Sequence, residues 1–320
     1  MQAAAASAPP CATRLALIAT TFPLISNEEL AAPGAFEALC ARVAAAGYAG
    51  LDASVLHVLL VGKARFAAAL AAHGLRFIAK CYSSGGGCPT GSAAALANAE
   101  HAHPPQGRSA AAHAAVFSAQ VREAAGSELL RPLLIAVSGQ YGRDYFGAAD
   151  EDLLFDAADA LAREFGVTVQ IETHRHRLLS SPWAARAAVA RRPALRLIAD
   201  LSHFVVVCET PPGDPDLEEA VAELVPHVTH THARVGHEEG PQVPDVTDAR
   251  WAPHVAGHVL WWKAIFRAHI ARGDALCTVT PEFLPFPYGP VGFGRDETWR
   301  ANEHIAGVVR RAWDGVLAEG

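Results

Sequence analysis

The sequence predicts an α/β fold in a single domain, a (β/α)8 TIM barrel, from three observations. Short runs rich in apolar and β-branched residues recur eight times, and segments with apolar side chains at helical spacing lie between them. The runs are apolar on both faces, as strands are in a parallel sheet covered by helices. Eight such units in about 300 residues is the repeat count of this barrel. A doubly wound sheet is the alternative.

The predicted strands are residues 14–23, 47–55, 75–83, 133–140, 167–174, 195–203, 228–236 and 277–283. Apolar residues at helical spacing from Leu154 to Phe165 predict the helix before the fifth strand, and those from Val255 to Ile270 predict the helix before the eighth. Ser181 followed by Pro182 is typical of an N-cap and a first helical turn, which places a helix after the fifth strand.

Two segments do not fit the alternation. Residues 1–14 are rich in alanine, and we expect a short disordered N-terminus, which leaves residues 15–320 as the barrel. Residues 82–108, after the third strand, are too many and too poor in bulky apolar side chains for an ordinary connection. We expect a long flexible loop there, either a lid or a disordered insertion.

Composition narrows the class of protein. The net charge is −7, and no basic stripe interleaved with aromatic residues occurs, so a nucleic-acid partner is not expected. No apolar run reaches the roughly 18 residues of a membrane helix. The six cysteines form no CxxC pair, which argues against a thiolate zinc site or a disulfide framework. We expect a cytoplasmic protein; the sequence does not indicate its oligomeric state.

Ionisable residues cluster where the last four predicted strands end. They are Glu172 and His174, then Asp200 and His203, then His230, His232 and Arg234, and finally Glu282. In a barrel these ends share one face, where catalytic groups gather. Taken alone, each histidine could be a hydrogen-bonded core residue and each aspartate a helix cap.

Carboxylates within apolar strands are costly to bury without a cation, and one divalent ion would satisfy them all. Carboxylates with an imidazole suit Mn²⁺, Mg²⁺ or Co²⁺, and Zn²⁺ is possible. The sequence therefore favours a metal site over a set of unrelated structural residues.

A basic loop and two earlier strand ends add candidate contacts. His174 is followed by Arg175 and Arg177, which would suit an anionic group such as phosphate or carboxylate. For Arg177 we favour the alternative, a solvated loop. Lys80 and Asp52 end the third and second strands and are candidates for substrate hydroxyl contacts.

Four stretches at the ends of strands five to eight carry a resemblance to a known family. They are "QIETHRHRLLSSP", "IADLSHF", "HTHARVGHEEGPQVPD" and "TPEFLPFPY", in this order along the chain. They resemble the xylose isomerase-like TIM-barrel superfamily, in the group of sugar phosphate isomerases and epimerases. At the end of strand four this group has an asparagine and a histidine, whereas this sequence has Ser138 and Gln140.

The resemblance implies roles for the clustered residues. The metal ligands would be Glu172, Asp200, His232 and Glu282. The two glutamates would also exchange the substrate proton. His203 would lie beside the substrate, Arg234 would clamp an anion or hydroxyl, and His230 would face a neighbour or the substrate, with His174 and Lys80 as further substrate contacts.

These residues predict a metal-dependent isomerase or epimerase of a sugar or sugar phosphate, acting by proton transfer through an enediolate. One alternative is an apurinic endonuclease-like phosphodiesterase, but the strands that end in Asp52, Lys80 and Ser138 lack the extra histidines of its zinc cluster. The other is a non-catalytic barrel that binds metal and sugar. Which sugar, whether it is phosphorylated, and whether it is isomerised or epimerised stay open.

Overall fold

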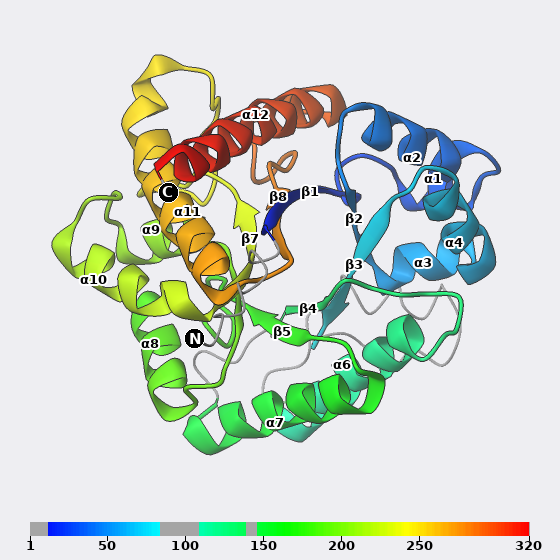
Figure 1. Cartoon of the computed structure of the whole chain (residues 1–320), viewed down its shortest axis with the longest axis horizontal. Helices are drawn as coiled ribbons and strands as arrows, with labels where there is room; N and C mark the ends of the chain where they lie inside the picture. The colour runs from blue at the N-terminus through cyan, green and yellow to red at the C-terminus, as the bar shows by residue number, and fades with distance from the viewer. Residues whose placement is uncertain (1–11, 84–108, 139–145, 320) are drawn as a thin grey trace, which may run out of the picture.

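Eight parallel strands close into a barrel in the computed structural model, which describes residues 12–83, 109–138 and 146–319 (Figure 1). Each strand pairs with the next along the chain, and β8 closes the ring on β1. The strands are β1 Arg14–Thr20, β2 Gly50–Ser54, β3 Arg76–Tyr82, β4 Ile135–Ser138, β5 Val169–Glu172, β6 Leu197–Ala199, β7 Val228–Ala233 and β8 Leu276–Pro281. The predicted (β/α)8 fold is confirmed.

Helices surround the ring of strands (Figure 1). They are α1 Asn27–Ala31, α2 Ala35–Ala45, α3 Val55–Val61, α4 Lys63–Ala72, α6 Ala110–Ala125, α7 Ala148–Phe165, α8 Pro182–Arg191, α9 Ser202–Cys208, α10 Pro215–Leu224, α11 Ala252–Arg272 and α12 Arg295–Glu319, with short 3-10 helices η1 Val225–His227 and η2 Ala249–Trp251. The Ser181 hydroxyl accepts from the Ala184 amide before α8, so the predicted N-cap is confirmed.

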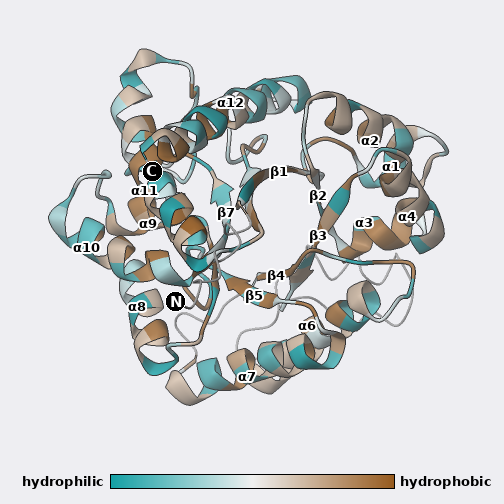
Figure 2. Ribbon diagram, viewed as in Figure 1, coloured by the Kyte–Doolittle hydropathy of each residue, from teal (hydrophilic) through white to brown (hydrophobic). Residues whose placement is uncertain are grey.

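The core lies between the strands and the helices. Figure 2 shows hydrophobic colour on β1, β4 and β5 and mixed colour along α7 and α12. Because successive strand residues point to opposite faces, Leu17 of β1 packs in the main core, whereas Ile18 joins Ile78 and Ile198 in a separate apolar cluster. Alternation places that cluster on the opposite face of the strands from the main core, which in a closed barrel is the interior.

The first described strand begins near the N-terminus. Arg14 is the first residue of β1, and residues 1–11 lie outside the described residues. Of the predicted loop 82–108, Tyr82 ends β3 and residues 84–108 lie outside the described residues. In the described parts of the chain no single helix has the length and apolarity to cross a membrane; α3 with α4, bent by 95°, would pass on those two criteria alone.

Candidate metal centre

Four side chains meet where the last four strands end. They are Glu172 at the end of β5, Asp200 just after β6, His232 in β7 and Glu282 just after β8. All four are buried, and one ligand atom from each lies within 4.8 Å of the others. The four residues thus lie together because consecutive parallel strands end on the same face of a barrel.

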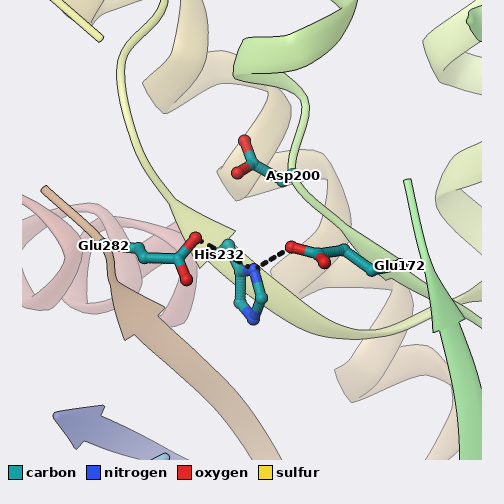
Figure 3. A group of neighbouring side chains, drawn as sticks. All are labelled: Glu172, Asp200, His232 and Glu282. Carbon is teal, nitrogen blue, oxygen red and sulfur yellow. Dashed lines mark hydrogen bonds and ion pairs between the residues drawn. The ribbon is translucent and has the colours of Figure 1, made fainter. Parts of the chain in front are cut away.

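The imidazole of His232 lies between the two glutamates (Figure 3). Its Nδ1 is 2.8 Å from Oε1 of Glu172 and 3.2 Å from Oε2 of Glu282. Burial alone would lower the pKa of His232, but the carboxylates of Glu282 and Glu172 raise it to about 10. Burial alone would raise the pKa of Glu172 and of Glu282. The neighbouring His232 nevertheless holds the pKa of both carboxyls well below the usual range.

These donors fit one divalent cation. Mg²⁺ takes oxygen ligands at 2.0–2.1 Å, so donors on opposite sides of such an ion are about 4.2 Å apart, close to the spread of this group. Three carboxylates and one imidazole are the hard and borderline ligands of Mg²⁺, Mn²⁺ or Co²⁺. Within the described residues, this is the one group of at least three such donors at metal-binding spacing.

The far edge of the His232 ring supports the same reading. Its Nε2 is buried without a hydrogen-bond partner and lies 3.8 Å from Oδ2 of Asp52. Oδ2 also accepts no hydrogen bond, although Nζ of Lys80 is 3.3 Å away. Histidines that bind metal through one ring nitrogen usually direct the other N–H at a carboxylate. Nδ1 of His232 is therefore the ligand atom that the geometry favours.

Three cations lie among the carboxylates. Arg177 Nη1 is 2.8 Å from Oε2 of Glu172, and Lys80 Nζ is 2.8 Å from Oε1 of Glu282. Each glutamate therefore directs one oxygen to His232 and the other to a cation. Arg234 pairs with Oδ2 of Asp200. These cations, together with His232, offset the charge of the buried acids, as buried charges require.

Glu172 is held by its neighbours on β4 and in the following loop. The Ser138 hydroxyl donates to Oε2 at 2.8 Å. The loop turns back because the His174 amide donates to the Leu179 carbonyl at 3.1 Å and the Arg177 amide to the His174 carbonyl at 3.2 Å. The Arg177 side chain is 17% exposed and returns to Glu172. The expectation of a solvated Arg177 is wrong: pairing with a buried carboxylate offsets its desolvation.

Glu282 is positioned through the backbone that follows it. The Asn302 side chain accepts from the Phe283 amide at 2.6 Å and donates to the Phe283 carbonyl at 3.1 Å. Gln242 makes the same pair of bonds to Leu284, at 2.8 and 2.9 Å. Two buried amide side chains thus fix the segment after β8. Sequence reasoning missed both, because nothing in the spacing of an isolated Asn or Gln marks it as a backbone clamp.

A cavity of about 200 Å³ opens above the two glutamates. Its polar lining is Lys80, Ser138, Glu172, His174, Arg177 and Glu282, and its apolar lining includes Phe22, Leu284 and Tyr288. Nδ1 of His174 donates to the Arg175 carbonyl at 2.7 Å, which leaves Nε2 as an acceptor. Burial and the nearby Arg177 hold the pKa of His174 well below its usual value, so the ring is neutral.

The other predicted contacts lie deeper. His203 is fully buried, its ring centroid 3.6 Å from that of His174, and its Nε2 accepts from Arg234 at 2.8 Å. His230 lies two residues before His232 in β7, so both side chains point to the same face of the strand. Its Nδ1 is 2.9 Å from the Thr278 hydroxyl and its Nε2 3.2 Å from that of Thr280. Both nitrogens of His230 already have protein partners, which favours the interpretation that it faces a neighbour. Gln140 lies outside the described residues.

The comparisons with known proteins concern the fold. No family model matches the chain, and no curated protein matches it in sequence. Among solved structures, L-ribulose 3-epimerase aligns with a TM-score of 0.61 at 14% identity, over 96% of this chain and 97% of its own. A xylose isomerase-like TIM barrel protein from Mycobacterium smegmatis, in complex with magnesium, aligns at 0.56 and 15%, over 93% and 98%.

The chain has the xylose isomerase-like TIM-barrel fold. A third barrel of this kind, D-allulose 3-epimerase from Methylomonas sp. in complex with D-allulose, aligns with a TM-score of 0.56 at 13% identity, over 96% of this chain and 97% of its own. Identities this low establish shared architecture. A shared fold does not fix the function, which depends on the side chains of the site.

Proposed function

We propose that this chain is a divalent-metal-dependent sugar isomerase or epimerase that transfers a proton through an enediolate. The observation that carries the proposal is the placement of Glu172 and Glu282. They flank His232 from opposite sides, and both line the same cavity. A substrate in that cavity would have a carboxylate base on each side.

The metal would be held by Glu172, Asp200, His232 and Glu282, and when bound it supplies positive charge that stabilises negative charge developing on substrate oxygens. One glutamate removes the proton next to the carbonyl, and either the same one or its counterpart returns it. Return from the opposite side inverts the carbon, which is epimerisation. Return to the adjacent carbon moves the carbonyl, which is isomerisation.

Lys80 and Arg177 contribute hydrogen-bond donors at the cavity wall. Each holds the glutamate oxygen that does not face His232, and each lines the cavity. Burial alone would lower the pKa of Lys80, but Asp52 and Glu282 hold it well above the usual value, so the ammonium stays charged. Together with His232, these cations keep the glutamates ionised, the form in which a carboxylate can accept a proton.

The solved structures with this fold support the proposal by what they are: two of the three above are sugar 3-epimerases, and one barrel is a magnesium complex. Phosphodiester cleavage by a cluster of zinc ions has less support. The group of donors in the described residues has the size for a single ion, and β2, β3 and β4 end in Ser54, Tyr82 and Ser138, with no histidine.

Deuterium exchange tests the proposal. The protein, loaded in turn with Mn²⁺, Mg²⁺ and Co²⁺, would be incubated in D₂O with a panel of ketoses, aldoses and their phosphates and followed by proton NMR. We expect deuterium on the carbon next to the carbonyl of at least one sugar, and no exchange after chelation. The variant Glu128→Gln, at an exposed position, is the control and should exchange deuterium at the parental rate. Metal and sugar binding without exchange would favour the non-catalytic barrel.

A further inference from the structure

Arg175 differs from the other cations near the centre because it has no carboxylate partner. Lys80, Arg177 and Arg234 are each within 4.0 Å of a carboxylate oxygen. Among the described residues no such contact reaches Arg175, and its Nη1 is buried without a hydrogen-bond partner. Its guanidinium carbon lies 5.4 Å from the centre of the Tyr288 ring.

Arg175 lines a second hollow, of about 380 Å³, next to the first cavity. Tyr288 lines both, and its ring also lies 5.0 Å from the guanidinium carbon of Arg234, which pairs with Asp200. The Tyr288 ring is thus near both guanidinium groups, which links the second hollow to the metal centre through Arg234 and Asp200. Other polar side chains of this hollow are His237, Gln242 and the exposed Glu239, and Glu239 forms no ion pair with Arg175.

An unpaired guanidinium in such a place is costly. A partly desolvated cation loses hydration without gaining a counter-charge, and native proteins seldom leave this uncompensated. Burial lowers the pKa of Arg175, and Arg234 and Arg177 lower it further, although Tyr288 and the more distant carboxylate of Asp200 oppose them. The surroundings thus disfavour the charge of Arg175, and a bound anion would remove that penalty.

We propose that the substrate of this barrel carries a carboxylate or phosphate group, and that Arg175 binds this group in the second hollow. The inference rests on the proposed function, since it places the carbonyl end of the same molecule between Glu172 and Glu282. A guanidinium pairs with either anion through two parallel N–H donors. The substrate class is then a sugar acid or a sugar phosphate, because a neutral sugar leaves Arg175 unpaired.

Binding measurements test the anion site. The Mg²⁺-loaded protein would be titrated calorimetrically with fructose, fructose 6-phosphate, D-gluconate and inorganic phosphate. We expect at least one anionic compound to bind about ten- to a hundredfold more tightly than fructose, as charge-assisted hydrogen bonds provide. Preference for fructose 6-phosphate and inorganic phosphate identifies a phosphate site, and preference for D-gluconate a carboxylate site.

The variant Arg175→Gln should lose this advantage and leave fructose binding unchanged, whereas Arg163→Gln, on the exposed face of α7, should behave like the parent. Circular dichroism of each variant checks that it is folded. The proposal is overturned if no anion binds better than fructose, or if the advantage survives in Arg175→Gln.

The two proposals can fail separately. Anion binding that depends on Arg175, with no deuterium exchange on any sugar, leaves the anion site standing and removes the isomerase. Deuterium exchange on neutral sugars that is unaffected by Arg175→Gln leaves the isomerase standing and removes the anion site.

Discussion

Oδ2 of Asp52 lies 3.8 Å from Nε2 of His232, on the ring edge away from the two glutamates. Both atoms are buried, and neither has a hydrogen-bond partner. With Nδ1 of His232 bound to a cation, Nε2 carries the ring proton, and a small movement brings it into hydrogen-bond range of Asp52. Asp52 would then orient the imidazole and raise its basicity, as outer carboxylates do in metal sites.

The first prediction follows from this contact. Asp52→Asn should weaken the affinity for Mn²⁺ about 10- to 100-fold, because the ligand loses the carboxylate behind it while all four donors remain. Competition with a chromophoric chelator measures the change. Asp314→Asn, at an exposed position of α12, is the matched control and should leave the affinity unchanged. Equal affinities in the two variants would mean that Asp52 does not support the ligand.

The four donors themselves carry a second prediction. Asp200→Asn and His232→Ala should each reduce the affinity for the same ion by at least about tenfold, since each removes or weakens a direct ligand. Metal content of the purified protein, with about one ion per chain expected, completes the measurement. If both variants retain the parental affinity, these residues are not the metal ligands.

Metal binding should also release a proton. Without metal, the carboxylates of Glu282 and Glu172 outweigh burial and raise the pKa of His232 to about 10, so the imidazole is protonated at neutral pH. A metal requires the neutral ring, so affinity should rise with pH, by up to about tenfold per pH unit below that pKa. Calorimetry in buffers of different ionisation enthalpy counts the protons, and an affinity independent of pH between about 7 and 9 would contradict the protonated ring.

Much of the barrel could be predicted from local pattern. The strands β1 to β7 lie within the predicted runs and β8 begins one residue before its run, because a strand apolar on both faces is distinctive in a parallel sheet. The grouping of Glu172, Asp200, His232 and Glu282 follows from the same logic, since polar residues at the ends of consecutive strands meet on one face.

Contacts that depend on how the chain turns back on itself could not be predicted. Arg177 looked solvated because its loop is basic, and only the turn that closes on Leu179 brings it to Glu172. Asn302 lies on α12, 19 residues from the backbone that it holds. Neither contact leaves a periodic trace in the sequence. Arg175 is likewise unpaired because the fold places no described carboxylate within ion-pair distance of it, which the sequence does not reveal.

Asn302 carries a prediction on stability. Its side chain satisfies both the N–H and the carbonyl of buried Phe283, so Asn302→Leu leaves two buried backbone groups without partners. We expect the free energy of unfolding to fall by about 2–6 kcal/mol, at roughly 1–3 kcal/mol for each group. Urea denaturation followed by circular dichroism measures the loss. Because Glu282 adjoins this segment, metal affinity should fall with it; a stable variant with parental affinity would show that the clamp is dispensable.

The last prediction separates proton transfer from metal binding. Glu172→Gln and Glu282→Gln each remove a base while keeping side-chain shape and one carbonyl oxygen that can bind a cation. At saturating metal, each should slow deuterium exchange by about a hundredfold or more, as the loss of a general base does. Ser138→Ala is an informative companion, because it removes a donor to Glu172 and leaves the carboxylate in place.

The pattern of losses assigns the chemistry. If both glutamine variants bind metal but neither exchanges, each glutamate is needed, as expected for a proton taken from one side and returned from the other. If only one variant loses exchange, that glutamate acts as a single base, and the reaction is isomerisation or one-sided exchange. Parental exchange rates in both would exclude the two glutamates as bases. Product formed without solvent deuterium in a single turnover would indicate hydride transfer, a reaction in which Glu172 and Glu282 only hold the metal.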